Sequence, residues 1–276
     1  MTNDEAVICM RTPNEHPVDC QGAGVGYLHR LGSDSPTPSR RGLASPSDTI
    51  APPAPAIPSD DSGPSWANLM RRYAAGTPAD GIRHLADSLG VSVASLKRLG
   101  FAWAGPHRAW AIPMRDIAGE VGGIRLRAES GQKWAVKGSR AGFFLPDGEL
   151  PDQADEVLVC EGPTDTAAML DLGFVALGRP SCQGLEDQLA LLLTRRRVVI
   201  VADNDRKSHP DGSVYHPGQE GAAKLAGILA NGPTTSVKII YPQDAKDARA
   251  WKLAGVTADL IRMRIRQAKL ILRKER

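Results

Sequence analysis

Two short apolar runs that stop abruptly at acidic residues constrain this chain more than any other feature. The first extends from Glu156 to Cys160 and the second over residues 198–202. Runs of this length, rich in Val and bounded by turn residues, are typical of strands buried on both faces. The residues that end them are Glu161, Gly162, Pro163 and Asp165 after the first run, and Asp203, Asn204 and Asp205 after the second.

Helical patterns alternate with these strands and predict an α/β fold with a parallel sheet. We expect helices over residues 164–172 and 186–193, and further strands over 174–177 and 237–242. Crossovers of this kind build parallel sheets with right-handed connections. Ligands of such sheets bind outside the carboxyl ends of the strands. Glu161, Asp203 and Asp205 are therefore expected to converge at one edge.

Three converging carboxylates predict a metal site. They repel one another unless a cation neutralises them. Mg²⁺, or Mn²⁺ in its place, is the expected cofactor, because it prefers hard oxygen ligands and leaves positions open for water and phosphates. The alternative is that each acid caps a helix or is solvated, the usual fate of a single Asp or Glu. The two strand-end motifs together favour the metal site.

These motifs resemble the Toprim family, the catalytic domain shared by bacterial-type primases, type IA and type II topoisomerases, OLD-family nucleases and RecR-type repair proteins. The family signature is a strand ending in Glu-Gly, often with Asp four residues after the Glu, and then a strand ending in Asp-x-Asp. Here these residues are Glu161, Gly162, Asp165, Asp203 and Asp205, and the resemblance covers about residues 154–255. It implies that Glu161 acts as general base or acid and that the Asp pair binds metal.

Two further segments are similar to primases. Residues 112–127 resemble the segment just before the Toprim domain in bacterial and phage DNA primases, with an Asp-x-x-Gly turn before a Gly-rich strand that ends in Arg. Asp247 matches an acidic family position, whereas Arg249 stands near where many members have a second acid. The resemblance therefore implies Asp165 and Asp247 as additional acidic site residues.

The chain departs from the primase pattern after Asp205. Residues 206–220 intervene before the next helical pattern resumes at Gly221. His209, Asp211 and His216 of this insertion are expected at the surface, the default for loop residues. Contact with metal or phosphate is the alternative.

A β-rich segment precedes the Toprim-like region. Alternating apolar residues predict strands over residues 108–115, 120–127, 132–136 and 143–146. Arg125 and Arg127 are two residues apart, so on a strand they share one face. Contact with nucleic-acid or nucleotide phosphate and simple solvation are equally good interpretations of such a face. The candidate phosphate-binding residues are Arg125, Arg127, Lys133, Lys137, Arg140 and Arg179.

Three short amphipathic helices are expected over residues 66–75, 79–90 and 92–100, with Ser92 as an N-cap and Gly90 and Gly100 at helix ends. A helix-turn-helix that binds DNA is one interpretation. A packing module is favoured, because the positive charges are scattered rather than gathered on one face.

The two ends of the chain differ in character from the middle. Residues 1–64 hold 10 of the 21 prolines and are expected to be disordered. Cys9, His16, Cys20 and His29 lie there, but without a C-x-x-C pair a zinc module is not favoured. Residues 257–276 predict a basic helix that either binds nucleic acid or packs its Leu and Ile stripe.

Composition narrows the class of protein only slightly. Lys and Arg number 34 against 31 Asp and Glu, an imbalance that neither demands nor excludes a nucleic-acid partner. Four cysteines, with no apolar run long enough to span a bilayer, predict a cytoplasmic protein without membrane association. No G-x-x-x-x-G-K-[ST] motif occurs, so a replicative helicase is expected to be a separate partner.

The sequence as a whole predicts four parts: a disordered stretch (1–64), a helical and β-rich primase-type subdomain (65–150), a Toprim domain (151–256) and a basic helix (257–276). The predicted function is Mg²⁺-dependent nucleotidyl transfer that makes or extends primers on single-stranded DNA. The alternatives are a Toprim nuclease and a catalytically inactive nucleic-acid-binding accessory factor of replication or of a mobile element.

Overall fold

The structure is a computed structural model that describes residues 65–152, 156–181, 184–209 and 211–273, together with the backbone of three N-terminal strands. Contacts divide the chain into two units, one of residues 1–53 with 210–213 and one of the remaining residues. Each unit is described by itself. No helix in the described ranges is both long and apolar enough to cross a bilayer.

The N-terminal strands form an antiparallel sheet in the order β1-β3-β2. Their bounds are β1 (Ala6–Cys9), β2 (Pro17–Asp19) and β3 (Val25–Arg30). The prediction of a disordered stretch is wrong for these three segments. Pro17 does not prevent pairing, because it is the first residue of an edge strand, a position that proline tolerates. Of the four residues considered for a zinc module, His16 and Cys20 lie outside the described residues, and only the backbone of Cys9 and His29 is described.

Three helices open the larger unit, as the sequence predicts: α1 (Trp66–Ala75), α2 (Ala79–Leu89) and α3 (Val93–Arg98). The Ser92 hydroxyl accepts a hydrogen bond from the Ser95 backbone at 3.0 Å and so caps α3. Gly90 ends α2 with a φ of 65°, a left-handed conformation that glycine adopts without steric cost.

A four-stranded antiparallel sheet follows in the order β4-β5-β6-β7. Its strands are β4 (Ala102–Ala104), β5 (Ala109–Arg115), β6 (Val121–Arg127) and β7 (Lys133–Ala135), with a 3₁₀ turn, η1 (Gly105–His107), between the first two. The strand predicted over residues 143–146 is wrong. Phe143 and Phe144 instead make two isolated bridges, to Arg115 and to Gly178. They are followed by the turn η2 (Pro146–Gly148).

The second sheet of this unit has the order β14-β13-β10-β8-β9 and is parallel except for β14. Its strands are β8 (Glu156–Cys160), β9 (Ala176–Gly178), β10 (Arg197–Val201), β13 (Ser236–Ile240) and β14 (Leu270–Ile271). The crossover helices α4 (Pro163–Asp171), α5 (Glu186–Leu192) and α6 (Pro217–Asn231) confirm the predicted alternation of strands and helices.

The insertion at residues 206–220 forms a hairpin, β11 (Lys207–Ser208) and β12 (Val214–Tyr215), and the first turn of α6. The helix predicted to resume at Gly221 thus begins four residues earlier, at Pro217. Two helices follow β13, α7 (Ala248–Leu253) and α8 (Ala258–Gln267). The predicted helix over 257–276 is therefore too long. After Ala268 the chain turns back as β14 and pairs with Val237 and Lys238 of β13. Strand β14 is therefore the edge strand on this side of the sheet.

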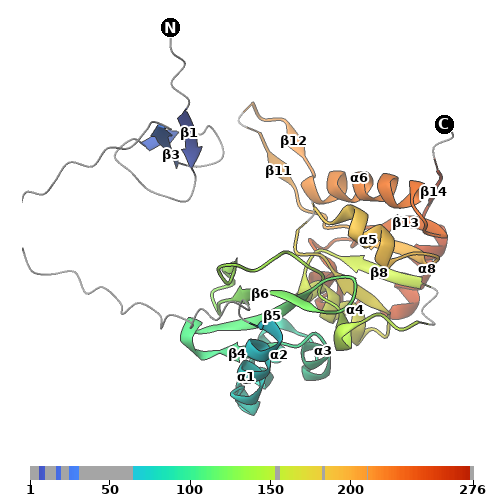
Figure 1. The fold of residues 1–276 in the computed structure, drawn as a ribbon. Helices are drawn as coiled ribbons and strands as arrows, with labels where there is room; N and C mark the ends of the chain where they lie inside the picture. The colour runs from blue at the N-terminus through green and yellow to red at the C-terminus, as the bar shows by residue number, and fades with distance from the viewer. Residues whose placement is uncertain are drawn as a thin grey trace, which may run out of the picture. The chain divides into compact units, whose positions relative to one another are not determined.

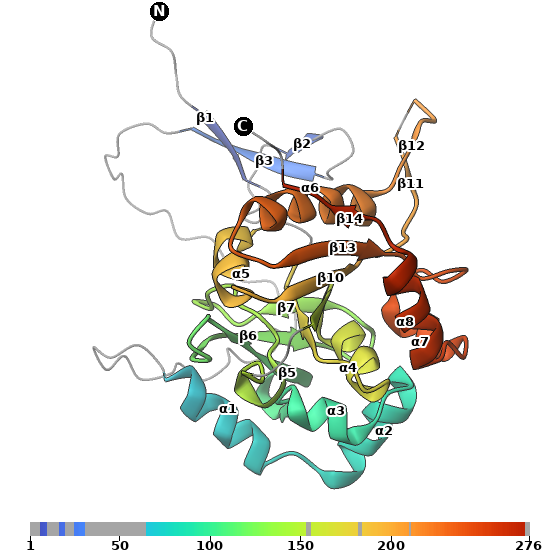
Figure 2. The same cartoon turned by 90° about the vertical axis from the view of Figure 1, so that its right-hand side faces the viewer.

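Helices cover both faces of the parallel sheet, which explains why the central strands β8 and β10 are apolar after their first residue (Figures 1 and 2). Alternate residues of β8 pack in opposite directions. Val157 and Val159 join the core under α5 and α6, whereas Leu158 and Cys160 join the core under α4, α7 and α8. Helices α2 and α3 share this second core. The boundary predicted near residue 150 thus separates two sheets but not two hydrophobic cores.

Candidate active site

Glu161 and Asp203 lie at the same edge of the parallel sheet, as the sequence predicts. Strands β8 and β10 are direct parallel neighbours, with Val159 opposite Ile200. The two strands therefore end side by side at the same edge. Glu161 comes two residues after Val159, and Asp203 comes three residues after Ile200. The order of strands β13, β10 and β8 brings the segment after β13, with Asp247, to the same edge.

Gly162 and Pro163 turn the chain from β8 directly into α4. Gly162 has a φ of 119°, a conformation that side chains disfavour, and Pro163 occupies the first helical position, where its missing N–H is not needed. This abrupt turn places Asp165 in the first helical turn, where it is 6 % exposed. Its carboxylate accepts a hydrogen bond from the backbone of Arg249 at 3.0 Å. Asp165 thus joins the start of α4 to α7.

The start of α6 holds the residues after β10. The Gly218 backbone donates to the Asp205 carboxylate at 3.2 Å, and the Nδ1 atom of His216 lies 3.1 Å from the Asp205 carbonyl oxygen. A Cβ at Gly218 would lie 2.6 Å from the Asp203 carbonyl oxygen, so only glycine allows α6 to approach this closely. His216 therefore supports the backbone at Asp205. His209 instead stacks on Tyr215 in the hairpin, with ring centroids 4.2 Å apart.

Asp247 and Arg249 occupy the start of α7. Asp247 caps the helix by accepting a hydrogen bond from the Ala250 backbone at 2.7 Å. The Arg249 guanidinium donates to the Leu89 carbonyl oxygen of α2 at 3.3 Å, and its charge opposes the rise in the pKa of Asp165. Arg249 thus links α7 to α2.

Five acids form one electrostatic group, which we call the carboxylate cluster. Its members are Glu161, Asp165, Asp203, Asp205 and Asp247. Burial, followed by repulsion from the other four members, raises the pKa of Asp203 to about 8. Burial also raises the pKa of Glu161 to about 7, although Arg179 opposes the change, and raises that of Asp165 to about 6. Acids crowded this closely either take up protons or bind a cation.

The chemistry of the carboxylate cluster fits a divalent cation such as Mg²⁺. Among the His, Cys, Asp and Glu side chains that the structure describes, no three form a ready ligand set. Mg²⁺ does not require one, because it is typically bound through one or two carboxylates and completes its shell with water and substrate phosphates. Asp203 and Asp205, with Glu161 beside them, are the residues that could hold it.

The predicted phosphate-binding cations differ in where they lie. Arg125 is half-buried and donates to the Pro180 carbonyl oxygen at 3.1 Å, which ties β6 to the loop after β9. Arg127 is opposite Lys133 across β6 and β7, and both lie within electrostatic reach of Asp165. Lys137 and Arg140 are exposed and form no ion pair with a described residue.

Arg179 is not placed at a surface that a phosphate can reach. It is 3 % exposed, donates to the Gly184 carbonyl oxygen at 3.0 Å and lies 3.6 Å from the Glu186 carboxylate. The prediction that Arg179 contacts phosphate directly is therefore not supported. Its buried charge acts on Glu161 instead, whose pKa it lowers against the effect of burial. Sequence reasoning missed this pairing, because only the folded strand ends bring the two residues together.

Comparison with solved structures identifies the fold. The chain is similar to the DnaG primase catalytic domain bound to ssDNA, with 16 % identity, a TM-score of 0.57 and coverage of 74 % of this chain and 77 % of that one. The E. coli primase catalytic core gives 16 % identity, a TM-score of 0.56 and coverage of 74 % and 79 %. The RNA polymerase domain of Mycobacterium tuberculosis primase DnaG has 18 % identity and a TM-score of 0.52, and the match covers 74 % of this chain and 82 % of that one.

This fold is that of a primase catalytic core. No family model matches the sequence, and no curated protein is detectably similar to it. At identities below 20 % the likeness concerns the arrangement of the chain rather than its chemistry. The primase fold confirms the predicted Toprim-like sheet and the primase-type segment before it, and it leaves the activity to be argued from the residues.

Proposed function

We propose that the chain is a primase-like nucleotidyltransferase that joins nucleotides on a single-stranded DNA template. The observation that carries this proposal is the carboxylate cluster at the carboxyl edge of a primase-fold sheet. Five acids gathered there by three different segments, with the pKa of Asp203 raised to about 8, suit the binding of divalent cations better than any structural role. A structural role would favour paired charges.

Different residues of the site would have different roles in the transfer step. The attacking 3′-hydroxyl oxygen forms a bond to the α-phosphorus of the incoming nucleotide, the α–β phosphoanhydride bond breaks, and pyrophosphate leaves. Glu161, whose metal-free pKa is about 7, accepts the hydroxyl proton. Asp203 and Asp205 would hold Mg²⁺, which when bound neutralises phosphate charge and orients the triphosphate. Arg127 and Lys133 supply positive charge beside the cluster.

A direct assay tests the proposal. Protein, single-stranded DNA, radiolabelled ribonucleotides and Mg²⁺ are incubated and the products separated on a gel. We expect short labelled oligomers with the wild type and none with the Asp203→Asn, Asp205→Asn double variant. Glu149→Gln, an exposed acid outside the cluster, is the matched control and should behave as wild type.

The same assay distinguishes the alternatives. End-labelled DNA that is shortened, rather than used as a template, would show a Toprim nuclease. Unchanged DNA without any labelled product would refute catalysis and leave a nucleic-acid-binding accessory factor. One observation favours this second candidate function: Arg249, turned toward α2, stands where many family members have a second acid.

A further inference from the structure

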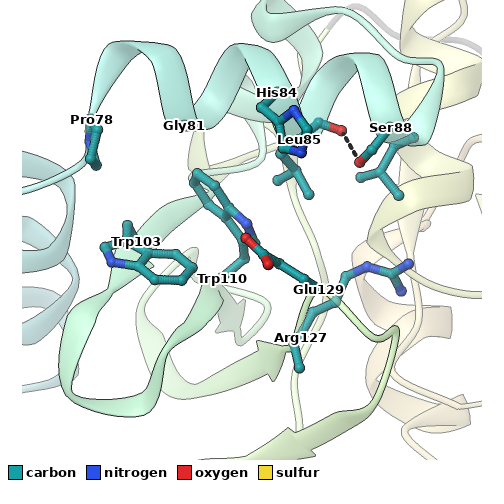
Figure 3. Close-up of a pocket in the computed structure, with 11 residues that line it drawn as sticks. Pro78, Gly81, His84, Leu85, Ser88, Trp103, Trp110, Arg127 and Glu129 are labelled. Carbon is teal, nitrogen blue, oxygen red and sulfur yellow. Dashed lines mark hydrogen bonds between the residues drawn. The ribbon is translucent and has the colours of Figure 1, made fainter.

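A cavity of about 250 Å³ lies between helix α2 and the four-stranded sheet, outside the carboxylate cluster. Trp103 of β4 and Trp110 of β5 line it with their rings edge to face and their centroids 5.3 Å apart (Figure 3). Gly81 of α2 lies over Trp110, where even a Cβ would come within 3.7 Å of the indole. Trp110 is almost fully buried, whereas Trp103 is partly exposed. The cavity thus has an aromatic wall that a ligand can reach.

One cross-strand row connects this aromatic wall with the candidate active site. Trp103 is opposite Trp110, Trp110 is opposite Arg127, and Arg127 is opposite Lys133. Residues paired in this way project from the same face, with Cβ atoms about 4.5–5.5 Å apart. Both cations lie within electrostatic reach of Asp165. The row therefore begins at two indole rings and ends beside the carboxylate cluster.

Three polar side chains at the cavity have no partner among the described residues. His84, Arg127 and Glu129 line it and form no hydrogen bond or ion pair within those ranges. The Glu129 carboxylate points toward Trp110, and the Arg127 guanidinium points away from the two indoles (Figure 3). A carboxylate only accepts hydrogen bonds and a guanidinium only donates them. A complementary ligand is flat and aromatic, with N–H donors on one edge and an anion on its other side.

We propose that this cavity binds a single nucleobase, stacked on Trp103 and hydrogen-bonded to Glu129, while Arg127 contacts the adjoining phosphate. The volume is below the ~300–1,000 Å³ of pockets for drug-sized ligands, so one ring system fits rather than a whole nucleotide. Glu129 favours bases with an exocyclic amino group, namely cytosine, adenine and guanine. The inference rests on the proposed function for its ligand class. A template strand and a free nucleotide both offer this chemistry.

Binding measured in EDTA, without turnover, tests the pocket separately from catalysis. We compare Trp103→Leu with Trp134→Leu, a matched control on the same sheet whose side chain packs on the opposite face. Fluorescently labelled short oligo(dC) is followed by anisotropy, and CTP by calorimetry. Loss of base stacking should weaken binding by about 5- to 140-fold in Trp103→Leu and leave the control unchanged.

The two probes identify the source of the base. A loss confined to oligo(dC) assigns the pocket to a template base, and a loss confined to CTP assigns it to an incoming nucleotide. Equal affinity of wild type and Trp103→Leu for both probes overturns the proposal. Because catalysis plays no part in these measurements, failure of primer synthesis leaves their outcome standing.

Glu129→Ala provides a second test that does not disturb packing, because Glu129 is exposed at the rim. Wild type should bind oligo(dC) more tightly than oligo(dT), and the variant should bind the two more equally. A preference for oligo(dC) that survives the substitution unchanged would overturn the assignment of Glu129 as the group that selects the base.

Discussion

Replacing Asp203 with asparagine should stabilise the metal-free protein at high pH. The carboxyl group is partly buried among four other acids, which raises its pKa from the ordinary 3.8 to about 8, burial being the larger cause. The folded protein therefore holds this proton more tightly than the unfolded chain does. The contribution of the proton to stability is fully present below about pH 4 and is lost as the pH rises through 8. The neutral amide of the variant would carry no such dependence.

The size of the effect follows from the shift. Each pKa unit corresponds to about 1.36 kcal/mol, so a change of about 4 units sets an upper limit of about 6 kcal/mol. Asp203 is partly exposed and shares its titration with the other cluster members, which reduces the expected difference to about 2 kcal/mol. In a protein of this size that corresponds to an increase in Tm of about 4–8 °C.

Thermal unfolding in EDTA, monitored by calorimetry at pH 5, 7 and 9, measures the difference. Asp203→Asn should be more stable than wild type at pH 9, with the gap shrinking toward pH 5. Mg²⁺ should raise the Tm of the wild type and raise that of the variant less, because binding to the folded state stabilises it. Equal Tm values for the two metal-free proteins at pH 9 would refute the electrostatic account of the cluster. Glu149→Gln serves again as the control.

Three further substitutions follow from the site and its supports. Glu161→Gln should keep single-stranded DNA binding but lower nucleotidyl transfer by ~10²- to 10⁴-fold in the gel assay, because an amide cannot accept the proton; near-normal transfer would exclude the general-base role. Asp171→Ala should lower the free energy of unfolding by about 2–4 kcal/mol in urea titrations, because the buried Asp171 carboxylate accepts hydrogen bonds from Ser92 and Ser95 at α3 and from Lys252 of α7. A decrease below about 1 kcal/mol would contradict this account. Gly218→Ala should weaken Mn²⁺ binding in calorimetry by displacing α6 from Asp203, whereas Gly227→Ala on the same helix, where a Cβ meets nothing within 4 Å, should leave it unchanged; equal affinities in the two variants would argue against the close approach.

The acidic strand ends could be predicted from sequence because the signals that define them are local. An apolar run that stops at Glu161 or at Asp203 identifies a buried strand and its end without knowledge of any distant residue. The alternation of helices and strands then fixes a parallel sheet, and parallel strands present their carboxyl ends at one edge. The cap at Ser92 and the left-handed glycine at Gly90 were predicted for the same reason, since each depends on its immediate neighbours.

Features that depend on pairing between distant segments could not be predicted. The basic end of the chain was predicted to be one helix, but β14 adds to the edge of β13, which depends on the position of a strand about 30 residues earlier. Arg179 was predicted to contact phosphate, but the fold buries it near Glu161.

The row from Trp103 to Lys133 depends on the register of three strand pairs. The sequence therefore determined which residues end strands and carry charge. Only the tertiary structure decided which of them meet, because strand register and burial are set by long-range contacts whose free energies no local pattern contains.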